Sequence, residues 1–229
     1  LFQYWEIPLV TVFVWYGMLI ALLACWSFEG HPIYWFMTGY QFPVYISDIG
    51  ATSLQPIFIS CSGFQGIFFV LTLIAERWLR YKRKLLPNTL KIQVIFASCS
   101  IVAACISMLG ILFTSIFNTN SFDHVHFAMV SIFIGFAFLV CALNTINYLL
   151  LWKYSYRDEM INLFNCYKVN RFAFSFWCKL IWVAFAAAFA IAFGAAMEED
   201  HDSISSCFEW TLSFWYGILL CIYAIDLSP

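Results

Sequence analysis

Six long apolar stretches dominate this chain of 229 residues, and they constrain its fold more than any other feature. A helix needs roughly 20 apolar residues to cross the hydrocarbon core of a bilayer. None of the stretches shows the alternation of apolar and polar residues that a membrane-spanning strand requires. The sequence therefore predicts an all-α polytopic membrane protein whose single domain has six transmembrane helices. The expected spans are residues 8–27, 55–75, 92–117, 126–152, 177–197 and 210–225.

The composition excludes an ordinary soluble domain. Hydrophobic residues make up 63% of the chain and charged residues only 10%, whereas soluble domains carry about 25% charged residues. A water-soluble fold of this size has too small a core to hide so much apolar surface. Lipid must therefore be the solvent for much of this chain.

The basic residues predict the orientation of the spans. All Lys and Arg lie in or beside two segments, one between the second and third spans and one between the fourth and fifth. The connections on the opposite side contain acidic residues but no Lys or Arg. Because cytoplasmic loops are enriched in Lys and Arg, both basic segments and both chain ends are expected in the cytosol.

Two charged features lie close to the spans themselves. Lys179 is placed about one turn inside the fifth span, and its long stem can reach the headgroups. We therefore expect Lys179 to extend to the cytosolic surface. Glu76 and Arg80 are four residues apart at the end of the second span, a spacing that predicts an ion pair on one helix face.

The basic segments are candidate contact surfaces. Juxtamembrane clusters attract anionic lipids with about 1 kcal/mol per basic residue. The cations can fix the topology alone, or they can also contact anionic lipid or a protein partner. Cys166, in the second segment, is a possible palmitoylation site, with an unmodified thiol as the alternative. The candidate contact residues are Arg77, Arg80, Lys82, Arg83, Lys84, Lys153 and Arg157.

Imidazoles and carboxylates gather on the non-cytosolic side. Residues 123–126 read Asp-His-Val-His, and Asp48 lies in the long first outer loop. Such a cluster could bind zinc and activate water. The spacing matches no recognised zinc signature, however, and no nucleophile motif is present. We therefore expect no metal, no cofactor and no catalytic residue, and retain a membrane-embedded lipid hydrolase using His124, His126 and Asp48 as a minor alternative.

The same outer loop ends in a distinctive motif. Residues 45–51 read Tyr-Ile-Ser-Asp-Ile-Gly-Ala, and Pro56 opens the second span. Ser-Asp followed by Gly predicts a turn in which side-chain oxygens bond to the backbone. The alternative is that Asp48 acts in a ligand or ion site.

The motif resembles the DRAM/FRAG/SFK family of membrane proteins. The segment from Tyr45 to Arg80 is most similar to the fungal branch, the "suppressor of four kinase" proteins. The relative that remodels GPI anchors has Ser-Ala in place of Ser-Asp and Pro-Arg in place of Glu76-Arg77. This departure disfavours the remodelling branch. The motif positions are Tyr45, Ser47, Asp48, Gly50 and Pro56.

The resemblance implies a multi-pass plasma-membrane protein without catalytic activity. Its fungal relatives work with the phosphatidylinositol 4-kinase complex and influence phosphoinositide levels and phospholipid asymmetry. The expected partners are therefore subunits of that complex and anionic membrane lipids, phosphoinositides included, and not nucleic acid. The main alternative is a transporter-like module that handles lipid through a polar path. The polar residues available for such a path are Gln65, Gln93, Asn144 and Asn147.

Overall fold

The computed structural model describes residues 3–37, 39–155 and 166–228, with side chains left out for residues 155 and 166–170. Six of its helices are long and apolar enough to cross a membrane, which confirms the predicted fold class and the number of spans. A seventh, very short helix was not expected. The helices are α1 (Glu6–Phe28), α2 (Ile46–Ile49), α3 (Gln55–Tyr81), α4 (Lys91–Ile116), α5 (Thr119–Ser155), α6 (Cys166–Glu198) and α7 (Asp202–Leu227).

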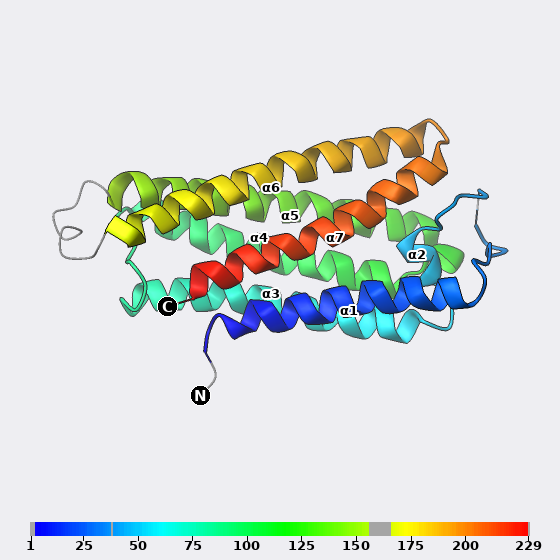
Figure 1. Cartoon of the computed structure of the whole chain (residues 1–229), viewed down its shortest axis with the longest axis horizontal. Coiled ribbons are helices and arrows are strands. Elements are labelled where there is room, and N and C mark those ends of the chain that lie inside the picture. The colour runs from blue at the N-terminus through cyan, green and yellow to red at the C-terminus, as the bar shows by residue number, and fades with distance from the viewer. Residues whose placement is uncertain (1–2, 38, 156–165, 229) are drawn as a thin grey trace.

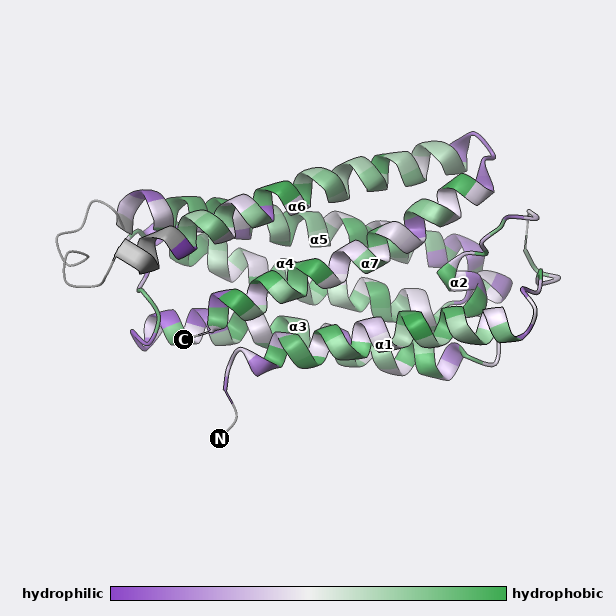
Figure 2. Ribbon diagram, in the orientation of Figure 1, coloured by the Kyte–Doolittle hydropathy of each residue, from purple (hydrophilic) through white to green (hydrophobic). Residues whose placement is uncertain are grey.

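The six long helices form a closed ring. Helix α1 packs on α3, α3 on α4, α4 on α5, α5 on α6 and α6 on α7, and α7 returns to α1. The connection between α3 and α4 lies at the same end of the bundle as both chain termini, whereas α2 lies at the opposite end (Figure 1). We call the end that carries residues 77–84 the basic end and the end that carries α2 the acidic end. Hydrophobic residues dominate the length between them (Figure 2).

Several helices begin before the predicted spans. Helix α5 begins at Thr119 rather than at residue 126, and α7 at Asp202 rather than at residue 210. Hydropathy marks only the part of a helix that crosses hydrocarbon, so polar first turns escape it. Phe122 has non-helical backbone angles (φ −143°, ψ 45°), so a kink separates the first residues of α5 from the rest.

Aromatic side chains fill the middle of the ring. The Tyr216 ring on α7 lies 5.3 Å from that of Trp15, 6.2 Å from that of Phe69 and 6.3 Å from that of Phe133, centroid to centroid. Its hydroxyl accepts a hydrogen bond from Gln65. Because these residues come from α1, α3, α5 and α7, they close the interior between the two ends.

Helices α4 and α5 approach closely at Gly110. A Cβ atom at this position would lie 2.8 Å from the backbone nitrogen and 3.0 Å from the Cα of Phe133. Ser107, nearly one turn earlier, donates a hydrogen bond to the carbonyl oxygen of Phe133 at 2.9 Å. Small residues allow such backbone contact between helices in lipid.

Candidate functional site

Residues 46–49 of the motif form the short helix α2, which was not predicted, and the predicted turn follows it at residues 50–54. The carboxylate of Glu209 on α7 accepts a hydrogen bond from the backbone N–H of Ile46 at 2.7 Å. A side-chain oxygen at a helix N-terminus satisfies an N–H that has no partner within the helix. Ile46 and Ile49 are buried, and α2 packs on α1, α5 and α7. The sequence motif therefore forms a small plug in the acidic end of the ring.

Asp48 is the buried charge of this plug. Its side chain is 5% exposed. It accepts hydrogen bonds from Gln41 Nε2 at 3.0 Å and from the Thr119 hydroxyl at 3.3 Å. Burial raises the pKa of Asp48 to about 6, against the opposing effect of these hydrogen bonds. The outer loop, α2 and α5 therefore meet at one carboxyl group.

The other motif residues hold the plug in place. The Tyr45 hydroxyl donates to Asp202 at 3.4 Å, and burial raises the pKa of Tyr45 to about 12. A Cβ atom on Gly50 would lie 2.4 Å from the Phe58 ring, which explains a glycine at this position. Pro56 lies in the first turn of α3, as predicted, where its missing N–H costs no helical hydrogen bond.

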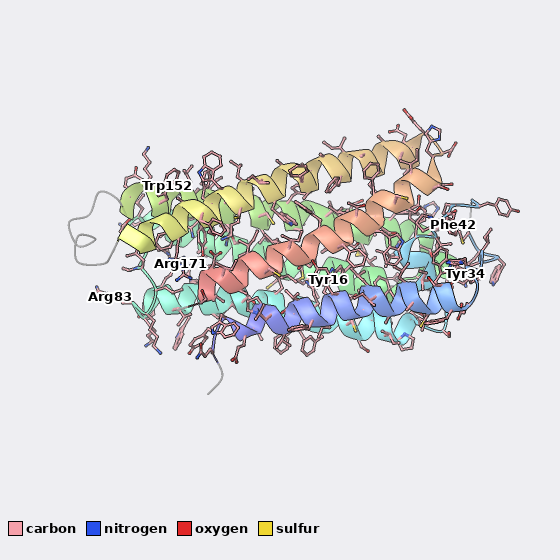
Figure 3. The ribbon with its side chains drawn as sticks, viewed as in Figure 1. Tyr16, Tyr34, Phe42, Arg83, Trp152 and Arg171 are labelled. Carbon is pink, nitrogen blue, oxygen red and sulfur yellow. The ribbon has the colours of Figure 1, made fainter. Side chains whose placement is uncertain are left out.

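A cavity of about 180 Å³ lies beneath α2, inside the acidic end. Its walls come from the outer loop and from all six long helices. Most of the wall is apolar, with aromatic side chains such as Phe133 and Trp182. Figure 3 shows Tyr34 and Phe42 of the outer loop at this end. The polar wall residues include Gln41, Asp48, Thr114, Thr119, Asp123, His126 and Glu209.

The imidazoles do not assemble into a metal centre. The Nδ1 atom of buried His126 lies 3.0 Å from the carbonyl oxygen of Thr114 and 2.8 Å from that of Phe117. Carbonyl oxygens only accept, so Nδ1 carries the proton and Nε2 of the neutral ring is left as an acceptor. His124 is exposed. Among residues 3–37, 39–155 and 166–228, no group of three His, Cys, Asp or Glu is placed to hold a metal ion.

Lys179 lies inside the ring near the basic end, so the prediction that it reaches the surface is wrong. Its side chain is 1% exposed. The ammonium group donates to Asp226 of α7 and to the Ser175 hydroxyl at 3.0 Å. It also lies 3.2 Å from the centre of the Tyr148 ring. A charge in a membrane span is stabilised by a partner inside the bundle, and Asp226 supplies it.

The predicted pair of Glu76 and Arg80 is confirmed and belongs to the same interior. Arg80 Nη2 lies 2.9 Å from Glu76 Oε1, and the Tyr148 hydroxyl donates to that oxygen at 2.8 Å. Arg80 is 3% exposed and also donates to the carbonyl oxygen of Leu86 at 3.0 Å. This places Arg80 away from the surface on which it was expected to meet lipid. We call Glu76, Arg80, Tyr148, Lys179 and Asp226 the buried network.

The remaining cations of the first basic segment are more accessible. Lys82, Arg83 and Lys84 are exposed at the end of α3, and Figure 3 shows Arg83 at this end of the bundle. Arg77 is half-buried and donates to the carbonyl oxygen of Val94 at 2.8 Å.

Lys153, at the end of α5, is the exposed cation of the second basic segment within the described side chains. Arg157 lies outside the described residues. Cys166 is the first residue of α6, and its side chain also lies outside the description.

The four polar residues of the proposed lipid path do not share one channel. Gln65 bonds to Tyr216 in the middle of the ring. The Gln93 side chain accepts from the backbone N–H of Leu90 at the start of α4. Asn144 and Asn147 line a small cavity beside Glu76 and Arg80 at the basic end.

Comparison with known proteins agrees with this architecture. The family model of the Frag1/DRAM/Sfk1/Cwh43P N-terminal domain matches residues 3–229. Protein SFK1 of Saccharomyces cerevisiae is 36% identical over 273 residues, which cover 96% of this chain and 76% of that protein. Protein sfk1 of Schizosaccharomyces pombe is 28% identical over 225 residues, which cover 97% of this chain and 63% of that protein. No solved structure matches the chain. The chain therefore belongs to the Frag1/DRAM/Sfk1 family of multi-pass membrane proteins.

Proposed function

We propose that this protein is a non-enzymatic regulator in the plasma membrane that acts with the phosphatidylinositol 4-kinase complex. It thereby influences phosphoinositide levels and phospholipid asymmetry. Membership of the family supports a regulatory role in a membrane. The observation that carries the proposal is the exposed triplet Lys82, Arg83 and Lys84 at the basic end, which we call the basic turn.

The basic turn presents its charges from a fixed backbone. The N–H of Lys84 donates to the carbonyl oxygen of Leu79 at 2.9 Å, and Arg83 adopts a left-handed conformation with φ of 56°. Arg80 holds the residues that follow through its bond to the carbonyl oxygen of Leu86. The buried network is therefore joined to the basic turn, whose three cations directly follow the end of α3.

The charge of the basic turn suits an acidic lipid or an acidic protein surface. At about 1 kcal/mol for each cation near an anionic membrane, three cations contribute about 3 kcal/mol. This energy corresponds to a change of roughly 100-fold in binding. A cationic surface of this kind would hold a bound kinase complex close to its phosphatidylinositol substrate.

Charge reversal of the basic turn tests the proposal. We expect the triple variant Lys82→Glu, Arg83→Glu, Lys84→Glu to recruit less kinase complex to the plasma membrane and to lower phosphatidylinositol 4-phosphate in cells. Lys82→Glu and Lys153→Glu compare one reversal in the basic turn with one reversal of an exposed cation outside it, and Lys153→Glu should have the smaller effect. Unchanged recruitment and lipid levels in a triple variant that reaches the membrane with its normal topology would refute the proposal.

A second candidate function, direct handling of lipid, is favoured by the acidic-end cavity. The cavity stops at the aromatic residues around Tyr216, and the buried network fills the interior beyond them. Transport across the bundle would therefore require the ring to open. A translocation assay on the purified protein in vesicles separates the two candidates, since a regulator alone moves no labelled lipid between leaflets.

A further inference from the structure

The acidic-end cavity is rich in hydrogen-bond acceptors. Asp48, Asp123 and Glu209 are among the residues that line it, as is His126, whose neutral ring has Nε2 as an acceptor. Among the described residues that line it, none is Lys or Arg. A ligand of this cavity should therefore supply donors and positive charge.

Two buried polar atoms of the wall have no partner within the described structure. They are the side-chain oxygen of Gln41 and the hydroxyl oxygen of Thr114, and both side chains are 3% exposed. Gln41 already donates from its amide nitrogen to Asp48, which fixes the direction of its oxygen. A buried polar atom without a partner costs about 1–3 kcal/mol, so native sites usually satisfy it. A donor inside the cavity would do so.

No cationic side chain is described beside the acidic residues of the cavity. Asp48 is held by neutral donors, an amide and a hydroxyl. Glu209 is held by a backbone N–H. Every Lys and Arg of the chain belongs to the two basic segments and their flanks. A phosphate group would meet the Asp48 carboxylate and the other acceptors of the wall without a cationic partner, and the cavity therefore disfavours anionic lipid headgroups.

The remaining wall suits an apolar chain. Phe133 and Trp182 face the cavity from α5 and α6. These two helices diverge toward the acidic end (Figure 1). Phe127 of α5 lines the cavity and is 45% exposed, so the wall reaches the outer surface of the bundle on this side. An amphiphile can keep its tail in the bilayer while its head enters the cavity.

We propose that the acidic-end cavity binds an amphiphile with a primary ammonium head and no phosphate, of the long-chain amino-alcohol class. The ammonium group donates to Asp48 and to the Gln41 oxygen, and the tail leaves between α5 and α6. A quaternary ammonium head has the charge but no N–H for Gln41, and it should bind more weakly. The site goes beyond the proposed function and stands on different residues, so either can fail alone.

Binding of sphinganine to the purified full chain tests the site. Sphinganine carries a primary ammonium, whereas N-acetylsphinganine keeps the chain and hydroxyls but is neutral. We expect sphinganine to bind at least tenfold more tightly than N-acetylsphinganine and than hexadecyltrimethylammonium, as measured by native mass spectrometry and by tryptophan fluorescence. Equal binding of sphinganine and its N-acetyl form would overturn the proposal, as would tighter binding of phosphatidic acid.

Three variants locate the binding. Asp48→Asn keeps the shape of the side chain but removes its charge and should weaken sphinganine binding about tenfold. Ala137→Phe places a ring into the cavity without touching the carboxylates and should block binding while the protein stays folded. Glu198→Gln changes an exposed carboxylate outside the cavity and is the matched control. Wild-type affinity in folded Asp48→Asn and Ala137→Phe proteins would show that sphinganine binds elsewhere.

Discussion

The buried network predicts that Lys179 is a major determinant of stability. Replacing Lys179 by Met keeps the unbranched stem of the side chain but removes the ammonium group that bonds to Asp226 and Ser175. Asp226 is then left in the interior with its side chain 3% exposed and without its cation. A lysine that reached the headgroups would have no such partner, so the substitution separates the two arrangements.

The expected loss is large. Breaking a buried ion pair by removing one partner costs about 3–5 kcal/mol. In a chain of this size, 1 kcal/mol lowers the melting temperature by about 2–4 °C. The variant Lys179→Met should therefore melt about 6–20 °C below the wild type. Replacing both partners by apolar residues, as in Lys179→Met with Asp226→Leu, removes both buried charges and should restore much of the loss.

Thermal unfolding of the purified proteins in detergent measures these differences. Lys153→Met is the matched control because Lys153 is exposed at the basic end. Surface ion pairs contribute only about 0–1 kcal/mol, so this control should melt close to the wild type. If Lys179→Met melted no lower than Lys153→Met, or if the double variant melted below Lys179→Met, the buried network would not stabilise the fold.

Two further predictions concern the helix contact and the motif. Gly110→Ala should lower the free energy of unfolding by about 1–3 kcal/mol, because its Cβ would meet the backbone of α5. Gly194→Ala is the control and should be neutral, because no atom lies within 4 Å of the new Cβ. Equal melting temperatures of the two variants would contradict the close packing of α4 on α5. Because the folded-state pKa of Asp48 is raised from 3.8 to about 6, its contribution to stability is fully present below pH 3.8 and falls by about 3 kcal/mol as the pH rises through 6. Asp48→Asn leaves Tyr45, Asp202 and Glu209 around the site, but its stability should not decline over this pH range. If the melting temperatures of the wild type and of Asp48→Asn changed in parallel with pH, the assignment of the decline to Asp48 would be refuted.

The sequence was sufficient for the spans because the signals that define them are local. A run of apolar residues by itself indicates that the segment lies in lipid. The four-residue spacing of Glu76 and Arg80 by itself indicates that they share one face of a helix. Helix number, the Pro56 position and this ion pair were therefore predictable. The sequence did not predict that the face carrying Glu76 and Arg80 points into the bundle, because the number of charges in a segment does not show which side of the helix contacts its neighbours.

The partners that determine the two interior sites lie far apart in the chain. Glu209 stabilises α2 from 163 residues away, and Asp226 meets Lys179 across 47 residues. Local patterns therefore predicted a turn after Ser47 and Asp48 but not the buried helix α2, and they predicted a surface position for Lys179. One signal was available: Asp226 is an acidic residue at the end of an apolar stretch, and such a charge calls for a partner inside the bundle.

The orientation of the bundle decides whether the basic turn can meet cytosolic partners. Cysteine labelling with a membrane-impermeant maleimide in intact cells tests it at both ends of one molecule. Cys207 is a native exposed cysteine at the acidic end, and Arg83→Cys adds one at the basic end. The account predicts that Cys207 reacts from outside and that Cys207→Ser abolishes this signal. In a Cys166→Ser, Cys207→Ser background, a cysteine at position 83 should react only after the membrane is permeabilised. Labelling of position 83 in intact cells would place the basic end outside and contradict the account.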